Sequence, residues 1–218
     1  MKNYENENLI KISFTGDILC DFPELKYMRK NHYNFEEIFK EISLKEPGEY
    51  LVGNLETPIC SFFPYTFEPF SFNSPKKFAN TIKDIGFNLV SIANNHCLDR
   101  GIHGAKFTKK FLQKINLIPS GIYMENEDCF EIVKINELKV AFLSYTYGTN
   151  YMHNHCRISK KNKLQVNLLK KQEINNVNFT KINTIRTNIK LFAKSTRLWK
   201  TLAKIKKRIQ RKKQHKNE

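Results

Sequence analysis

Three short apolar runs that each end in polar residues constrain the fold of this chain more than any other feature. The runs are "LIKISFTGD" (9–17), "YLVGNLE" (50–56) and "NLVSIANNH" (88–96). Apolar and β-branched residues followed by Gly, Asn or Asp are typical of a buried strand that enters a loop. Segments with helical spacing separate the runs, which predicts an α/β fold. In such folds ligands bind beyond the carboxyl ends of the strands, so these three ends mark the expected site.

The segments between and after these runs complete the predicted α/β sandwich. Apolar residues recur at helical spacing in the segments 34–42 and 74–87. Asn34 is placed to cap the first of these helices, and Gly86 is placed to end the second. The expected helices cover 34–42, 74–87 and 104–115, a short strand with a turn covers 117–123, and a hairpin within 130–146 turns at Asn136 and Glu137.

The polar residues at the three strand ends form the candidate site. They are Asp17, Asn54, Glu56, Asn95, His96 and Asp99. Carboxylates, an amide oxygen and an imidazole together are the ligand types of Mn, Zn, Fe or Mg sites that act on phosphate or carboxylate substrates. Each residue alone is more typical of a cap or a turn. Because three strand ends carry such residues in order, we expect a shared site rather than three separate turns.

Six stretches of the sequence resemble a known protein family. They are "FTGDILC", "VGNLETPIC", "GFNLVSIANNHCLDRG", "PSGIY", "KVAFLSYTYGTN" and "QVNLLKKQE". These stretches look like successive motifs of the CapA capsule-synthesis family, also called poly-γ-glutamate synthesis proteins, whose fold resembles that of calcineurin-like metallophosphoesterases. The resemblance extends from about residue 9 to residue 173.

The resemblance implies a metal-dependent site with one or two divalent ions. The implied metal ligands are Asp17, Glu56, Asn95 and His96, and the implied catalytic or supporting residues are His96, Asp99 and Asn54, with Asp99 orienting the histidine. The implied chemistry is that of a phosphoesterase-like enzyme or of an amide-bond hydrolase or transferase. The implied partners are the proteins that synthesise capsule or poly-γ-glutamate.

The chain also departs from the family pattern. Family members usually continue with an "HWG" and a "GHHPH" type motif that supply further histidines, and neither motif occurs in this sequence. We therefore expect residues 1–173 to form the first half of the sandwich only, as in a C-terminally truncated member. A non-catalytic accessory protein is the alternative to an active hydrolase. Local replacement by His153 and His155 is not expected, because "HNH" is predicted to lie in a solvated loop.

Residues 174–218 form a predicted basic tail. Residues 181–218 hold 14 of the 37 Lys and Arg residues but only one of the 21 acidic residues. Apolar residues recur there at helical spacing, which predicts an amphipathic helix. The helix could lie on an anionic membrane or dock on the body of the protein, whereas nucleic-acid binding is not favoured because no reading motif accompanies the charge. The tail residues expected to contact a membrane or partner are Arg197, Trp199, Lys200, Lys204, Lys207, Arg208 and Arg211.

The sequence shows no targeting segment of its own. No run of about 18 apolar residues is present, and the first residues lack the apolar stretch of a signal peptide. We therefore expect a cytoplasmic protein, and a basic tail that binds the membrane would place it peripherally at the inner face. Five cysteines without CxxC spacing are typical of reduced, mostly buried thiols rather than of a disulfide framework or a zinc site.

Overall fold

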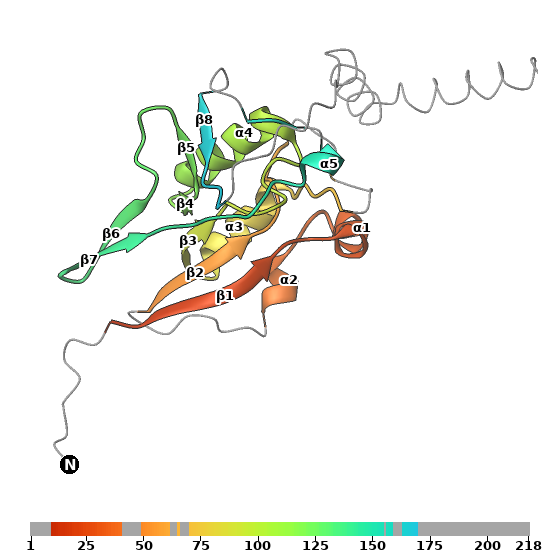
Figure 1. Ribbon diagram of the computed structural model, residues 1–218. Coiled ribbons are helices and arrows are strands. Elements are labelled where there is room, and N and C mark those ends of the chain that lie inside the picture. Colours follow the sequence, from red (N-terminus) through yellow and green to blue (C-terminus); the bar gives the residue numbers. More distant parts are fainter. Residues whose placement is uncertain are drawn as a thin grey trace, which may run out of the picture. The chain divides into compact units, whose positions relative to one another are not determined.

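A four-stranded parallel sheet in the order β1-β2-β3-β4 forms the centre of the structure (Figure 1). The structure is a computed structural model that describes residues 10–40, 49–61, 65, 70–154, 156–158 and 163–169. Its elements are β1 (Ile12–Ile18), α1 (Phe22–Lys30), α2 (Glu36–Phe39), β2 (Tyr50–Leu55), α3 (Lys76–Asp84), β3 (Phe87–Ser91), α4 (Gly101–Lys114), β4 (Ile118–Ser120), β5 (Ile122–Met124), β6 (Glu131–Ile135), β7 (Leu138–Phe142), α5 (Tyr151–Asn154) and β8 (Leu164–Val166). The predicted α/β class is confirmed by this sheet.

The strand register brings the polar strand ends side by side. Asp17 of β1 pairs with Asn54 of β2, and Asn54 pairs with Ser91 of β3. A β-bulge lies in β1 between Phe14 and Asp17, where three steps along β1 match two steps along β2. Side chains alternate between the faces of a strand, so the extra residue turns Asp17 to the same face as Asn54. Without the bulge, the Asp17 carboxylate would point to the opposite face.

The two faces of the sheet are covered differently. The main core contains Leu51, Leu55 and Val90 of the sheet together with Phe78 and Leu112 of the helices α3 and α4. Because Asn54 alternates with these positions along β2, it points to the other face.

The second face carries a smaller core. In it Val52 and Leu89 pack against Val133 and Phe142 of the β6–β7 hairpin. Since Val52 and Asn54 are two residues apart, they share this face. The candidate site therefore lies on the hairpin side of the sheet.

Several predicted elements are confirmed, and others need correction. The hairpin turns at Asn136 and Glu137 as predicted, between β6 and β7. The predicted helix at 34–42 is α2, a single turn within the described residues, and the Asn34 side chain accepts the N–H of Glu36 at 3.2 Å. Helix α1 and strand β8 were not predicted, and β8 pairs with β5 in a separate antiparallel sheet.

Asp17 and Asn54 each lie one residue before the end of their strand, so the site residues at the carboxyl ends of β1 and β2 are where the sequence predicts them. One expectation about local structure is wrong. His153 lies in the short helix α5 and not in a loop, since the N–H groups of His153 and Asn154 both bond to the carbonyl of Asn150. The basic tail, with its predicted helix and the seven residues named above, lies outside the described residues, as does His155.

No helix in the described part of the chain is both long enough and apolar enough to span a membrane. The five cysteines are free thiols: Cys20, Cys60 and Cys97 are buried, Cys156 is half-buried and Cys129 is exposed. Burial raises the pKa of the Cys97 thiol to about 12, which keeps it protonated beside the candidate site.

Candidate functional site

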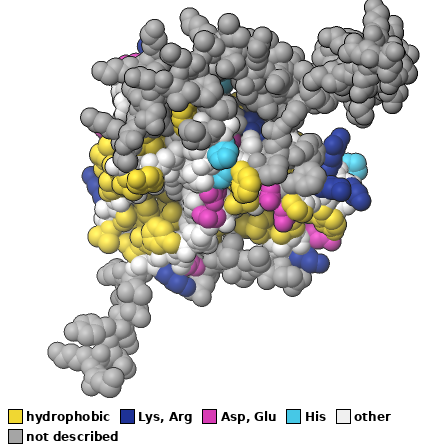
Figure 2. Space-filling model, turned by 45° about the vertical axis from the view of Figure 1, so that its right-hand side comes forward, with side chains coloured by type: hydrophobic (Ala, Val, Ile, Leu, Met, Phe, Trp, Pro, Cys, Tyr) yellow, Lys and Arg dark blue, Asp and Glu magenta, His cyan; other side chains and the backbone are white. Residues whose placement is uncertain are grey.

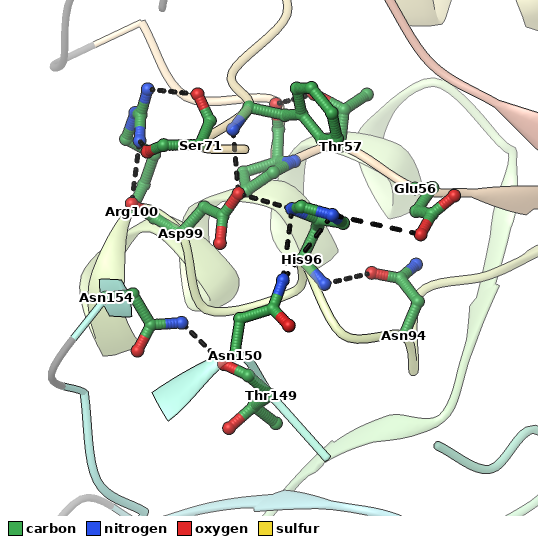
Figure 3. Close-up of polar contacts among 12 residues, drawn as sticks. Glu56, Thr57, Ser71, Asn94, His96, Asp99, Arg100, Thr149, Asn150 and Asn154 are labelled. Carbon is green, nitrogen blue, oxygen red and sulfur yellow. Dashed lines mark hydrogen bonds and ion pairs between the residues drawn. The ribbon is translucent and has the colours of Figure 1, made fainter. Parts of the chain in front are cut away.

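The structure brings five of the six predicted site residues into one polar cluster at the carboxyl ends of β1, β2 and β3. Figure 3 shows three of them, Glu56, His96 and Asp99. Asp17 and Asn54 come from β1 and β2, and Glu56 follows β2 directly. His96 and Asp99 come from the loop between β3 and α4. Figure 2 shows acidic and histidine side chains close to one another on one face of the molecule, beside a group of hydrophobic side chains.

His96 is held by a buried carboxylate. Its Nδ1 atom lies 2.7 Å from Oδ2 of Asp99, whose side chain is 1% exposed. The same carboxylate oxygen accepts the backbone N–H of Phe72 at 2.7 Å. Because an ionised carboxylate only accepts hydrogen bonds, the imidazole proton sits on Nδ1. The lone pair is then on Nε2, which is the arrangement found in histidines that bind metals.

The Nε2 atom of His96 faces Glu56. The distance from Nε2 to Oε1 of Glu56 is 4.0 Å, and both side chains are largely buried. The ring of Phe72 packs against the imidazole with centroids 4.2 Å apart. The imidazole is therefore fixed in direction, with its basic nitrogen turned towards a carboxyl group.

A chain of amide side chains connects the three strands. The Nδ2 group of Asn54 donates to Oδ1 of Asp17 at 2.8 Å. The Nδ2 group of Asn94 donates to Oδ1 of Asn54 at 3.1 Å and to the carbonyl of Leu55 at 2.9 Å, and its Oδ1 atom accepts the N–H of His96 at 3.2 Å. Since both amide atoms of Asn54 are used in this way, Asn54 orients Asp17 and is not placed as a ligand.

Asn94 and Asn95 differ in their surroundings. Asn94 is buried and binds three groups, as described above, although the sequence analysis did not select it. The Asn95 side chain is half-buried and makes no hydrogen bond within the described part of the chain. Asn95 is the sixth predicted site residue. Because its side chain makes no such bond there, its amide oxygen is available to a ligand.

The carboxyl groups of Asp17 and Glu56 influence each other. Burial raises the pKa of Glu56, and the neighbouring Asp17 raises it further through a hydrogen bond and its negative charge. The charge of His96 opposes this shift, and that of Asp99 adds to it. Two adjacent carboxylates repel each other, and a cation between them offsets this repulsion, so this pair favours a bound cation.

The donor types in the cluster suit a divalent cation. Two ligands that are each about 2.1 Å from one ion lie at most about 4.2 Å apart, so the 4.0 Å between His96 and Glu56 is compatible with a shared ion. No three His, Cys, Asp or Glu side chains converge as a ready metal-binding group in the residues that the structure describes. Small side-chain rotations of Asp17 or Glu56 would be required.

Two residues from distant parts of the chain also reach His96. Phe72 comes from the segment before α3, and Asn150 comes from the segment after β7, with its Nδ2 atom 3.4 Å from each ring nitrogen of His96. The only sequence signal for Asn150 was its place in the "SYTYGTN" stretch. His103 and His153 are exposed and lie outside these contacts.

Comparison with known proteins identifies a family model and relatives that match this chain. Residues 11–217 match the family model described as "Bacterial capsule synthesis protein PGA_cap". The chain is 28% identical over 154 residues to the capsule biosynthesis protein CapA of Bacillus anthracis. The aligned region covers 67% of this chain and 36% of that protein. It is 25% identical over 154 residues to the PGA biosynthesis protein CapA of Bacillus subtilis (strain 168), covering 67% and 39%. The matched part thus spans less than two fifths of either relative, and the family match over nearly the whole chain shows that this protein belongs to the bacterial capsule synthesis family PGA_cap.

Proposed function

We propose that the cluster binds one or two divalent cations and cleaves or transfers a phosphoester or amide bond during the synthesis of capsule or poly-γ-glutamate. The observation that carries this proposal is the placement of Nε2 of His96 opposite the Glu56–Asp17 carboxyl pair, with Nδ1 fixed by Asp99. The names of the two relatives support the biological setting. The proposed partners are accordingly the other proteins of that synthesis.

The residues that would hold a cation are Asp17, Glu56 and His96, with the amide oxygen of Asn95 as a further donor. Carboxylate oxygens and a neutral imidazole suit Mn, Zn or Fe, and the oxygens alone suit Mg. A cation in this position would act as a Lewis acid that polarises a phosphoryl or acyl oxygen of the substrate.

The side chains around these donors prepare them for binding. Asp99 keeps the proton of His96 on Nδ1, so Nε2 presents a lone pair. Asn54 donates to Oδ1 of Asp17 and so orients its carboxylate. Because His96 and Glu56 are largely buried, little water competes with a ligand for these groups. His96 is therefore oriented before any ligand arrives, whereas Asp17 or Glu56 must rotate to complete the proposed site.

Metal binding by purified protein tests this proposal. We expect Mn²⁺ or Zn²⁺ to bind in near-stoichiometric amounts by isothermal titration calorimetry and elemental mass spectrometry. Asp17→Asn and His96→Ala should each weaken binding at least about tenfold, because each removes a direct donor. His103→Ala is the matched control, since His103 is an exposed histidine outside the cluster. Equal metal content in wild type, Asp17→Asn and His96→Ala would reject the assignment.

The two proposed reaction classes are separated by a second assay. Metal-loaded protein is incubated with bis(p-nitrophenyl) phosphate and, separately, with a γ-glutamyl p-nitroanilide. Release of p-nitrophenol that is lost in His96→Ala would support phosphoester chemistry, and release of p-nitroaniline would support amide chemistry. If metal binds but neither probe reacts above the His96→Ala background, the non-catalytic accessory role becomes the better account.

A further inference from the structure

The segment between β7 and α5, which is distant in sequence from His96, contacts the His96 side chain through Asn150. The chain leaves β7 at Phe142 and extends towards α5, as Figure 1 shows. On its way the N–H of Thr146 bonds to the carbonyl of Asn167 at 2.9 Å, and Asn167 Nδ2 donates to the carbonyl of Ser144 at 3.1 Å. The segment is thus anchored at its middle before it arrives at Asn150.

The Asn150 amide lies over the face of the His96 ring. Its Nδ2 atom is 3.4 Å from Nδ1 and 3.4 Å from Nε2 (Figure 3). An atom equally distant from both ring nitrogens lies either over the ring or in the ring plane beyond Cε1. The in-plane position would bring Nδ2 into a steric clash with Cε1 at this distance. The amide therefore covers the ring face, where an N–H group interacts favourably with the π electrons.

The backbone of Asn150 is fixed in a conformation that suits this contact. Its φ angle is +48°, in the left-handed region that Asn tolerates better than most residues. Its carbonyl accepts the N–H groups of His153 at 2.8 Å and of Asn154 at 3.0 Å, which closes the single turn of α5. The Asn154 side chain in turn donates to the carbonyl of the buried Thr149. These bonds hold the Asn150 side chain against the imidazole.

We infer that Asn150 is a positioning residue that keeps the His96 ring in the orientation required for ligand binding through Nε2. Asp99 fixes the ring from its Nδ1 edge, and Asn150 restricts rotation by covering its face. The inference deepens the proposed function and rests on it for the effect on metal affinity. The effect on the ring itself does not depend on any metal.

The variant Asn150→Gly tests this inference with little disturbance of the backbone. Glycine adopts a positive φ angle without strain, and the carbonyl that accepts the α5 hydrogen bonds is retained. Asn136→Gly is the matched control, because Asn136 also has a positive φ angle, of +52°, but lies exposed in the β6–β7 turn. Thermal unfolding of both variants shows whether each one is folded.

The first measurement is a two-bond ¹H–¹⁵N correlation spectrum of the imidazoles without metal, at about pH 8, where most histidines are neutral. The His96 signals are assigned by their loss in His96→Ala. Wild type and Asn136→Gly should show a single tautomer of His96 with the proton on Nδ1. Asn150→Gly should show broadened His96 signals, because the uncovered ring can rotate away from Asp99. A spectrum of Asn150→Gly that matches the wild type would overturn the inference.

The second measurement is the zinc affinity of the same three proteins. Loss of a group that orients a metal-binding histidine lowers the affinity by about 10-fold to 100-fold, so Asn150→Gly should bind zinc at least tenfold more weakly. If wild type binds no zinc while the spectrum changes as expected, the proposed function fails and the positioning role of Asn150 stands. If wild type binds zinc and Asn150→Gly matches it in both affinity and spectrum, metal binding by the cluster is supported and the positioning role of Asn150 is overturned.

Discussion

Oδ2 of Asp99 lies 2.7 Å from Nδ1 of His96 and also 2.7 Å from the backbone nitrogen of Phe72. One buried carboxylate oxygen thus connects the loop after β3 to the segment before α3. The ring of Phe72 packs on the same histidine, so the two contacts support each other. This relationship explains how a histidine in an irregular loop acquires a single orientation.

Asp99→Asn should weaken divalent metal binding without preventing folding. The neutral amide oxygen is a weaker acceptor than the charged carboxylate for the bonds from His96 and Phe72, and weakening of such a partner lowers metal affinity by about 10-fold to 100-fold. Calorimetric titration with Zn²⁺ measures the change. Asp84→Asn is the control, because Asp84 is exposed at the end of α3. Equal zinc affinity in Asp99→Asn and wild type would show that Asp99 does not orient the histidine.

Asn94 and Asn95 should respond to alanine substitution in opposite ways. Asn94→Ala removes three hydrogen bonds in a buried position and leaves their partners unsatisfied, which should lower the free energy of unfolding by about 1–3 kcal/mol. Asn95→Ala should leave this free energy nearly unchanged and weaken metal binding. Urea denaturation and zinc titration of both variants distinguish the two roles. The assignment is wrong if Asn95→Ala is the less stable variant.

Gly53→Ala should destabilise the sheet. A Cβ atom at this position in β2 would clash with the Ile18 side chain and would lie 2.7 Å from the Phe87 ring. Such overpacking typically costs about 1–3 kcal/mol, which should appear as a lower melting temperature. Gly16→Ala is the control, because no atom lies within 4 Å of its added Cβ. Equal melting temperatures for the two variants would contradict the packing of β2 described here.

The ion pair of Glu127 with the buried Lys109 should make stability depend on pH. Burial raises the pKa of Glu127, but hydrogen bonds from Lys109 and from the Met124 N–H, together with the Lys109 charge, outweigh it and lower the pKa below its ordinary value. The folded protein therefore binds this proton more weakly than the unfolded chain does. The contribution to stability is present above the unfolded pKa of about 4.3 and is lost as the pH falls through the lowered folded pKa.

Glu127→Gln measures this contribution. The difference in free energy of unfolding between wild type and variant should be largest near about pH 6 and should shrink towards about pH 3. The effect is moderate, because the Glu127 side chain is 40% exposed and solvent screens the interaction. Glu125→Gln is the control, since the ion pair of Glu125 in the described part of the chain is with the exposed Lys163, at 3.6 Å. A difference that grows as the pH falls would contradict the predicted sign.

The basic tail should bind anionic membranes if its predicted amphipathic helix forms. Co-sedimentation with liposomes that contain phosphatidylserine, and not with neutral phosphatidylcholine liposomes, is the expected result, because 14 basic residues lie between residues 181 and 218. Added salt should reduce this binding. A variant with Lys204, Lys207 and Arg208 changed to Gln should bind less. Equal binding to both kinds of liposome would exclude electrostatic attachment.

The sequence by itself determined the order of strands and helices and the edge of the sheet at which the polar residues gather. Apolar residues at period two and at helical spacing report local structure directly, so β2, β3, α3 and α4 were predicted near their observed positions. Parallel pairing then brings Asp17, Asn54 and the β3 loop together without further information. The helix α1 and strand β8 gave weaker local signals and were missed.

Only the tertiary structure decided which atoms face one another within that site. The bulge before Asp17 turns its side chain to the face of Asn54, and no local pattern in "FTGD" requires this extra residue. The loop after β3 has no side-chain period, so the sequence could not distinguish the buried Asn94 from the half-exposed Asn95. The contact of Asn150 with His96 spans 54 residues and depends on the path of the chain after β7. Contacts of this kind arise from packing between distant segments, which residue spacing does not encode.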